Sequence, residues 1–187
     1  NRLYRGNRTT KYSAEHFSAF RSANFPPLAE AGIDIEYNSD AIRYPKKGTG
    51  LKIYEKLDSC VAVLKIFPGL NKETFNAVTG SKDLKGLIIE TFGSGNAITH
   101  KWFIDGLKNL VRNNVPVLNV TQCLSGSVNM ERYQTGRNLL DAGVTGGADI
   151  TIESAVVKMM FLLANTSGID EIKLKLQKSL RGEINAI

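Results

Sequence analysis

Glu90-Thr91-Phe92-Gly93-Ser94-Gly95-Asn96 closes an apolar run that begins at Gly86, and it sets the architecture of the surrounding sequence. In an open parallel sheet, strands end at the crevice where ligands bind, and glycines let backbone amides approach a ligand closely. The stretch carries one carboxamide side chain, that of Asn96. It therefore predicts a buried strand, then a ligand-binding loop and then a helix.

Two similar apolar runs lie on either side of this strand, at 61–67 and 115–121. Continuous apolar character is typical of strands that are covered on both faces. The segments between the runs have the periodicity of amphipathic helices, and Asn71 and Thr99 are expected to be their N-cap residues. Repeated strand-helix-strand units with right-handed crossovers predict an α/β fold with an open, mostly parallel sheet flanked by helices.

The residues after the third run predict a second loop at the same edge of the sheet. Gln122-Cys123-Leu124-Ser125-Gly126 is expected to lie beside the loop that contains Asn96, so that the two loops form the crevice. The rest of this region is predicted as a helix around 136–142, an extended piece at 148–150, an apolar helix over 156–163 capped by Thr151, and a last helix with Ile169, Ile172, Leu176 and Leu180 on its apolar face.

The composition changes near residue 45 and predicts two unequal parts. Residues 1–42 contain too few apolar residues in periodic runs to bury a core of their own, so we interpret them as the tail of an N-terminal α/β domain. A short helix is expected around 13–19 in this part. Residues 43–56, rich in lysine, glycine and proline at their start, have the composition of a linker. Residues 57–187 then form the C-terminal domain.

The charge and hydropathy of the chain exclude several classes of protein. The 187 residues carry a net charge of +6, but the basic surplus is three in residues 1–59 and three in residues 60–187, so it is nowhere concentrated as nucleic-acid binding would require. No apolar run approaches the ~18 residues of a membrane span, and no secretion signal opens the sequence. We expect a cytoplasmic protein with neither nucleic acid nor membrane as a partner.

Metal and disulfide sites are not indicated by the residues that usually form them. His16 and His100 lie in unrelated segments without a neighbouring histidine, cysteine or carboxylate pair. Cys60 and Cys123 lack a Cys-x-x-Cys partner, so reduced thiols are expected.

The glycine-spaced loop also lacks the marks of two common catalytic classes. The sequence Gly93-Ser94-Gly95-Asn96-Ala97-Ile98 has no third glycine, which a dinucleotide-binding turn would need. Neither Ser94 nor Ser125 stands in a nucleophile elbow, and neither histidine is placed as its base. We therefore expect no cofactor and no serine nucleophile.

Six motifs spread over essentially the whole chain resemble, in the same order, those of type I, cytoplasmic L-asparaginases. They are Arg5-Gly6-Asn7-Arg8-Thr9-Thr10-Lys11, Phe25-Pro26-Pro27-Leu28-Ala29-Glu30-Ala31-Gly32, the 90–96 stretch, Asn119-Val120-Thr121-Gln122-Cys123, residues 143–151, and Leu180-Arg181-Gly182-Glu183.

The resemblance implies an amidohydrolase that converts L-asparagine to L-aspartate and ammonia with a threonine nucleophile. In that family the nucleophile belongs to an N-terminal Gly-Gly-Thr segment, and a second set of residues includes a Thr-Asp pair and a lysine. Neither Gly-Gly-Thr nor Thr-Asp-Thr occurs in these 187 residues. We therefore expect the chain to hold the C-terminal domain and the last part of the catalytic domain, and to be inactive by itself.

The resemblance also implies a homo-oligomer, either a dimer or a dimer of dimers, with active sites between subunits. Asn96 matches an asparagine that reaches the substrate bound to the neighbouring subunit, and its carboxamide can accept from an ammonium group and donate to a carboxylate. The alternative role for Asn96 is to cap the following helix. Tyr133 resembles a tyrosine that orients the threonine nucleophile or its proton relay in the partner's site, and the alternative is a surface aromatic on a loop.

Glu90 marks a departure from the regulated bacterial members of this family. In those proteins an arginine at this position binds the carboxylate of an effector asparagine, and a cysteine that matches Cys123 lines the same site. A carboxylate at position 90 repels another carboxylate. We therefore expect that asparagine activation through this site is lost or altered.

Two other functions compete with this one. The glutaminase subunit of archaeal tRNA-dependent amidotransferases has a related fold, and the basic pI of about 9.3 is compatible with tRNA. A stand-alone ligand-binding or oligomerisation module without catalytic activity is the alternative from a different class.

Overall fold

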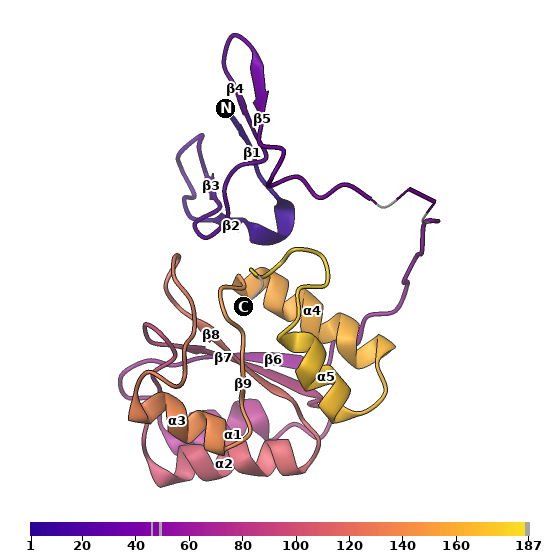
Figure 1. The fold of residues 1–187 in the computed structure, drawn as a ribbon. Coiled ribbons are helices and arrows are strands. Elements are labelled where there is room, and N and C mark those ends of the chain that lie inside the picture. The colour runs from indigo at the N-terminus through magenta and orange to yellow at the C-terminus, as the bar shows by residue number, and fades with distance from the viewer. Residues whose placement is uncertain (46, 49, 186–187) are drawn as a thin grey trace.

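The computed structural model describes residues 1–45, 47–48 and 50–185, and it has two parts (Figure 1). Residues 60–185 form a sheet flanked by helices, and the N-terminal residues form a smaller set of short strands beside it. Residues 50–60 connect the two without a helix or strand. The helices of the larger part are α1 (Lys72–Thr79), α2 (Lys101–Arg112), α3 (Gln134–Asp141), α4 (Ile152–Asn165) and α5 (Ile169–Leu176).

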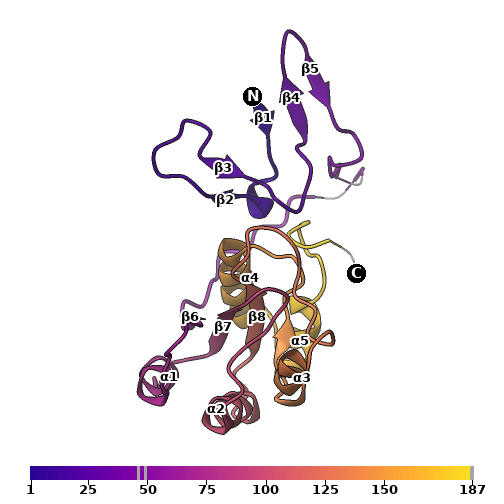
Figure 2. The same cartoon turned by 90° about the vertical axis from the view of Figure 1, so that its left-hand side faces the viewer.

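The central sheet is parallel throughout and confirms the α/β prediction. Its strands are β6 (Val61–Lys65), β7 (Gly86–Thr91), β8 (Val117–Thr121) and β9 (Thr145–Gly146), in the order β6-β7-β8-β9. Every neighbouring pair is parallel. The strand over 86–91 lies between β6 and β8, so its carboxyl end faces the ends of two neighbours (Figure 2).

Two hydrophobic cores cover the two faces of this sheet, which explains the uninterrupted apolar runs. Leu87 and Ile89 point into a core with α1, α2 and α3, whereas Ile88 points into a second core with α4 and α5. All three side chains are completely buried. Figure 1 shows the same division, with α1, α2 and α3 on one side of the sheet and α4 and α5 on the other.

The helix caps agree with the sequence at two of three positions. Asn71 and Thr151 are N-cap residues whose side chains accept hydrogen bonds from the backbone amides of Thr74 and Ser154. The cap expected at Thr99 is wrong, because α2 begins at Lys101 and its N-cap residue is His100.

The piece expected to be extended at 148–150 is instead a turn. Ala148 has a φ of 52°, and the amide of Ile150 donates to the carbonyl of Gly147 (3.2 Å). The strand that joins the sheet begins three residues earlier, at β9, and the amide of Gly147, directly after it, donates to the carbonyl of Asn119 in β8 (2.8 Å).

The N-terminal part contains short antiparallel strands and a 3-10 helix, η1 (Gly6–Arg8). One sheet has the order β1-β4-β5 and a second pairs β2 with β3. The strands are β1 (Arg2–Leu3), β2 (Thr10–Lys11), β3 (Phe20–Arg21), β4 (Ala29–Ala31) and β5 (Ile35–Tyr37).

The helix expected around 13–19 is wrong, since these residues connect β2 to β3. The amides of Tyr12 and Ser13 both donate to the carbonyl of Ala19, which closes a hairpin-like loop. The Ser13 hydroxyl accepts from the amides of Glu15 and His16, a local hydrogen-bonding pattern that competes with helix formation.

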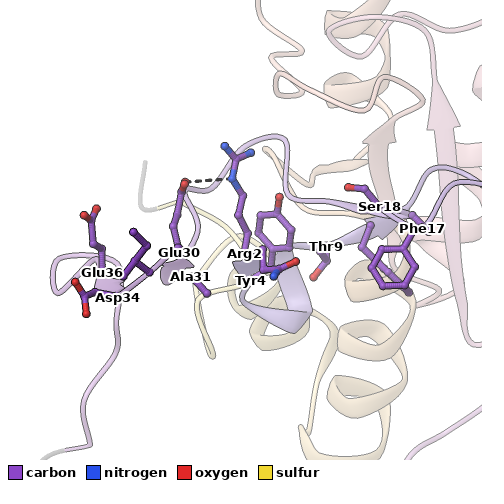
Figure 3. Close-up of a pocket in the computed structure, with 14 residues that line it drawn as sticks. Arg2, Tyr4, Thr9, Phe17, Ser18, Glu30, Ala31, Asp34 and Glu36 are labelled. Atoms are coloured by element: carbon purple, nitrogen blue, oxygen red, sulfur yellow. Dashed lines mark ion pairs between the residues drawn. The ribbon is translucent and has the colours of Figure 1, made fainter.

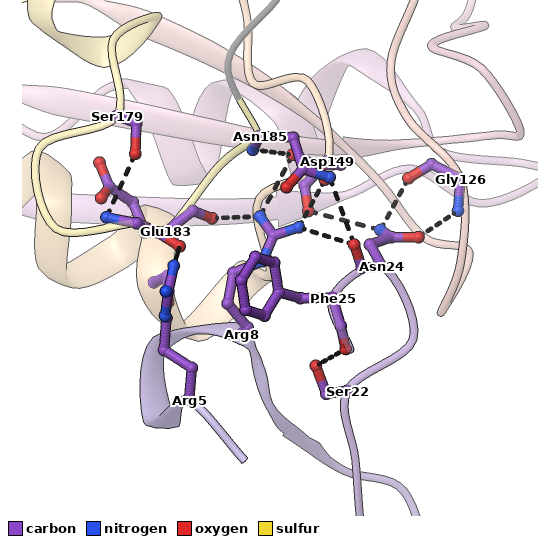
Figure 4. A network of polar contacts seen from close by, with 12 residues as sticks. Arg5, Arg8, Ser22, Asn24, Phe25, Gly126, Asp149, Ser179, Glu183 and Asn185 are labelled. Carbon is purple, nitrogen blue, oxygen red and sulfur yellow. Dashed lines mark hydrogen bonds and ion pairs between the residues drawn. The ribbon is translucent and has the colours of Figure 1, made fainter. Parts of the chain in front are cut away.

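A buried polar network joins the N-terminal part to the larger one (Figure 4). The Arg8 guanidinium donates to both carboxylate oxygens of Asp149 and to the carbonyl of Glu183 (2.7 Å). The Glu183 carboxylate in turn forms a buried ion pair with Lys158 (2.7 Å). Residues from both ends of the described chain therefore meet at the turn before α4.

Candidate functional site

The glycine-spaced loop at the carboxyl end of β7 is a tight closed turn. The amide of Phe92 donates to the carbonyl of Asn96, and the amide of Asn96 donates back to the carbonyl of Phe92, each at 2.9 Å. Gly93 and Gly95 have φ values of 51° and 111°, a region that favours glycine. The glycines therefore allow the chain to reverse directly after the strand.

A buried polar chain fixes this loop to β8. The Thr91 hydroxyl donates to the carboxamide oxygen of Asn119 (2.6 Å), and the Asn119 carboxamide nitrogen donates to the carbonyl of Gly95 (3.4 Å). The side chains of Thr91 and Asn119 are fully buried. A Cβ at Gly95 would lie 3.1 Å from the Asn119 nitrogen and 3.0 Å from Val128, so a larger residue would have to displace one of them as well as adopt the strained φ of 111°.

Asn96 is held by a residue of α3. The Thr135 hydroxyl donates to Asn96 Oδ1 at 2.6 Å, and the two hydrogens of this carboxamide lie on Asn96 Nδ2. An ideal Cβ at Gly93 would lie 4.0 Å from this nitrogen, at ordinary van der Waals distance, so Nδ2 lies beside Gly93. The capping alternative for Asn96 is wrong, because the N-cap of α2 is His100.

The loop after β8 lies against the glycine-spaced loop, as the sequence predicts. The Thr121 hydroxyl donates to the carbonyl of Gly93 (2.6 Å) and accepts from the amide of Cys123 (3.0 Å). Further along, the amide of Asn129 donates to the carbonyl of Ser94 (2.8 Å). The two loops therefore share hydrogen bonds at both ends.

Glu90 and Cys123 lie at neighbouring strand ends. The Gln122 carboxamide donates to the carbonyl of Glu90 (2.8 Å) and to that of Ile66 (2.6 Å), and it thereby ties the residue before Cys123 to β7. Glu90 is half-buried at the end of β7 and Cys123 is exposed. The fold thus brings together two positions that are 33 apart in the sequence.

Tyr133 stands at the amino end of α3, two residues before Thr135. It occupies the N-cap position, and its side chain is exposed. The Arg132 guanidinium lies over its ring, 5.5 Å from the centroid. The amino end of α3 therefore presents Tyr133 on the surface while Thr135 reaches inward to Asn96.

Thr135 could not be identified from the sequence. It is 39 residues from Asn96 along the chain, and no motif marks it. Only the packing of α3 beside the glycine-spaced loop reveals the contact.

The histidines and serines of the chain do not assemble into a hydrolytic site in the described residues. His100 stacks on Trp102 at the start of α2, and His16 lies in the β2–β3 connection. Across residues 1–45, 47–48 and 50–185, no group of three or more histidine, cysteine, aspartate or glutamate side chains could hold a metal ion. No helix in this described part of the chain is long and apolar enough to cross a membrane.

A large hollow lies away from this site, in the N-terminal part (Figure 3). It has a volume of about 1080 Å³ and is lined by residues such as Arg2, Glu30 and Phe17. Phe17 and Ile33 on its rim are fully exposed, so the hollow is an open space between short hairpins. A second hollow of about 740 Å³ lies between η1 and α4. We take the hydrogen-bonded loops as the candidate site in preference to these hollows, because ligand sites need convergent polar groups.

Comparison with known families gives the class of protein. Residues 60–174 match the glutaminase/asparaginase C-terminal domain, and residues 1–43 match the N-terminal asparaginase domain. The chain therefore belongs to the glutaminase/asparaginase family.

Individual relatives agree with this assignment. The chain is 39% identical over 184 residues to L-asparaginase 1 of Escherichia coli K12, a match that covers 98% of this chain and 54% of the relative. It is 35% identical to a glutamyl-tRNA(Gln) amidotransferase component of Methanobrevibacter smithii, with 98% of this chain and 42% of the relative covered. The crystal structure of L-asparaginase I from Vibrio cholerae superposes with a TM-score of 0.91 at 40% identity, covering 99% of this chain and 55% of the other. The chain thus spans about half the length of the asparaginases that it matches.

Proposed function

We propose that this chain is the C-terminal portion of an L-asparaginase, which hydrolyses L-asparagine to L-aspartate and ammonia. The observation that carries the proposal is the fixed carboxamide of Asn96, whose oxygen is held by Thr135 and whose nitrogen can donate beside Gly93. The identity of 39% to a protein named L-asparaginase 1 supports the same substrate. The threonine nucleophile belongs to residues other than these 187, and we propose that the 187 residues alone do not hydrolyse asparagine.

Asn96 binds the substrate in this proposal. Its Nδ2 group donates to the carboxylate of L-asparagine, since Oδ1 already accepts from Thr135. The site binds substrate in a homodimer or a dimer of dimers, and Asn96 acts on the substrate held by the neighbouring subunit. Tyr133, exposed at the amino end of α3, assists the nucleophile in that same neighbouring site.

Glu90 and Cys123 occupy the positions of the regulatory site in this proposal. The carboxylate of Glu90 repels the carboxylate of an effector asparagine, so activation through this site is lost or altered. The link through Gln122 supports the placement of both residues at one location.

The remaining assignments belong to the same proposal. We propose residues 1–42 as the tail of the catalytic domain, 43–56 as the linker, part of which lies outside the described residues, and 57–187 as the C-terminal domain. The protein needs no cofactor and acts in the cytoplasm, where free thiols such as Cys60 and Cys123 persist.

A subunit-mixing experiment tests the proposal. Full-length protein with its nucleophile replaced is mixed with full-length Asn96→Ala protein, and asparagine hydrolysis is measured after the subunits exchange. If Asn96 acts across the interface, half of the dimers regain one intact site, and about a quarter of the wild-type activity returns. No recovery beyond the sum of the two separate variants would contradict the action of Asn96 in the partner's site. A wild-type protein that releases no ammonia from asparagine would contradict the function itself.

The second candidate is the glutaminase subunit of a tRNA-dependent amidotransferase. The 35% identity to an amidotransferase component over nearly the whole chain favours it. Binding of tRNA that weakens steeply with salt would support this candidate over a free amidohydrolase.

A further inference from the structure

The loop over residues 122–130 connects the N-terminal part to the candidate site. Residues 123–127 in its middle are exposed, and the loop would be free to move without a contact there. That contact comes from Asn24, which lies 102 positions earlier in the sequence (Figure 4).

Asn24 makes two hydrogen bonds to one residue of this loop. Its carboxamide nitrogen donates to the carbonyl of Gly126 (2.9 Å), and its carboxamide oxygen accepts from the amide of Gly126 (2.8 Å). A carboxamide that pairs with both backbone groups of one residue fixes that residue in position and in orientation. Gly126 has a φ of 97°, so the loop is held in a conformation that few other residues adopt.

Asn24 is itself held by the buried network. Its backbone carbonyl accepts from the Arg8 guanidinium (3.1 Å), which is bound to Asp149. The Asn185 carboxamide nitrogen donates to the same carbonyl (3.3 Å). The carboxamide of Asn24 is therefore presented from a fixed backbone.

The far end of the loop rests on the glycine-spaced loop. The amide of Asn129 donates to the carbonyl of Ser94, and Val128 packs so closely on Gly95 that a Cβ there would lie 3.0 Å from Val128 Cγ1. Ser94 and Gly95 directly precede Asn96. The position of the 122–130 loop is thus transmitted to the residue that holds the ligand.

We propose that Asn24 is a positioning residue that sets the 122–130 loop and, through it, the Gly93–Asn96 loop. The inference rests on the proposed function for its effect on substrate, but its effect on the loops is independent of that function. Asn24 acts from the N-terminal part, so it links the two parts of the protein at the site.

Amide hydrogen exchange in the full-length protein tests the effect on the loops. In Asn24→Ala, exchange of the Asn129 amide is expected to rise about fivefold or more, because two hydrogen bonds that hold its loop are lost. The amide of Leu87, which donates to the carbonyl of Pro116 in the buried central sheet (3.0 Å), serves as an internal reference and is expected to stay unchanged. Ser22→Ala is the matched control, because Ser22 lies in the same turn and bonds to Phe25.

The outcomes separate positioning from general stability. An Asn129 rate within about twofold of wild type would overturn the proposal, and so would an equal rise at Leu87, which indicates global destabilisation. If Asn24→Ala does not fold, Gly126→Ala tests instead the loop conformation that the Asn24 contact holds. No atom lies within 4 Å of a Cβ at Gly126, so that variant strains the loop conformation without a clash and should accelerate Asn129 in the same way.

Steady-state kinetics test the effect on substrate. The KM of Asn24→Ala for L-asparagine is expected to rise about fivefold with kcat within about twofold, whereas Ser22→Ala changes neither. An unchanged KM would overturn the link to substrate. If the wild-type protein does not hydrolyse asparagine, the proposed function fails, and the exchange rates still decide the role of Asn24.

Discussion

Arg8 and Asp149 form a two-hydrogen-bond ion pair across 141 positions of sequence, with 2.6 Å between Arg8 Nη2 and Asp149 Oδ2. Both side chains are almost completely buried, with exposed fractions of 1% and 8%. The backbone amide of Asn185 also donates to Asp149 (3.0 Å). Replacing the Asp149 carboxylate with a neutral group is therefore costly, because the Arg8 charge would stay buried away from water without a counter-charge.

The first prediction concerns that pair. Asp149→Asn is expected to lower the free energy of unfolding by about 3 kcal/mol, since it leaves a buried guanidinium without its counter-charge. Asp105→Asn, which removes the exposed partner of Lys101, should change it by less than about 0.5 kcal/mol. Urea unfolding of both variants measures the difference. Equal and small effects would show that Arg8 gains access to water when its partner is lost.

The second prediction is a dependence of stability on pH. Burial opposes the ionisation of Asp149, but the hydrogen bonds from Arg8 and from Asn185 prevail and hold its pKa below the usual range. The unfolded chain therefore binds more protons than the folded one below about pH 4, so stability falls as the pH drops through this range.

Asp149→Asn removes that share of the pH dependence. Its free energy of unfolding should fall less steeply between about pH 4 and pH 2 than that of the wild type, as followed by denaturant titration at each pH. The pKa of Glu183 is also lowered, because hydrogen bonds from backbone amides and from Lys158 outweigh its burial. Glu183 therefore contributes part of the pH dependence of the free energy of unfolding in both proteins. Parallel curves would mean that the Asp149 pKa is the same in the folded and unfolded states.

The third prediction isolates the hydrogen bond from Thr135 to Asn96. Thr135→Val keeps the shape of the side chain but removes the donor, so Asn96 can rotate away from its binding orientation. In the full-length protein we expect the KM for L-asparagine to rise about 3- to 10-fold. Thr135→Ser keeps the hydroxyl and should stay close to wild type. A Ser variant as impaired as the Val variant would assign the effect to packing.

The fourth prediction tests regulation. Calorimetry of the full-length protein is expected to find one class of L-asparagine site, with no second site that depends on residue 90. Glu90→Ala should leave the binding isotherm unchanged, because a carboxylate does not attract the carboxylate of an effector. A second asparagine site in the wild type that disappears in Glu90→Ala would refute this expectation.

The parallel strands could be predicted well from the sequence because they are buried on both faces and so carry continuous apolar runs. Asn71 and Thr151 could be found as caps since their side chains act on amides three residues away, within the reach of a local pattern. The structure of the N-terminal part could be predicted less well from the sequence. The helix expected over 13–19 does not form, because the hydrogen bonds of Ala19 and Ser13 close a loop between two short strands.

Residues of the candidate site could be predicted only where they follow the end of a strand in the sequence. Asn96 lies five residues after the end of β7 and could be found from the glycine spacing. Thr135 and Asn24 could not, since each reaches the site from an element that packs there only after the fold has formed. Hydrogen bonds between distant segments leave no periodicity in the sequence.

The contacts of Arg5 and Arg8 with residues 182 and 183 have a consequence for synthesis of the chain. Their hydrogen bonds span 177 and 175 positions, so they form only after nearly all of the described residues have left the ribosome. At a synthesis rate of about 5–20 residues per second, roughly 10 to 35 seconds pass between synthesis of the β1–β5 segment and synthesis of these hydrogen-bond partners. During that interval the Arg8 guanidinium, which is almost completely buried in the folded structure, remains in water.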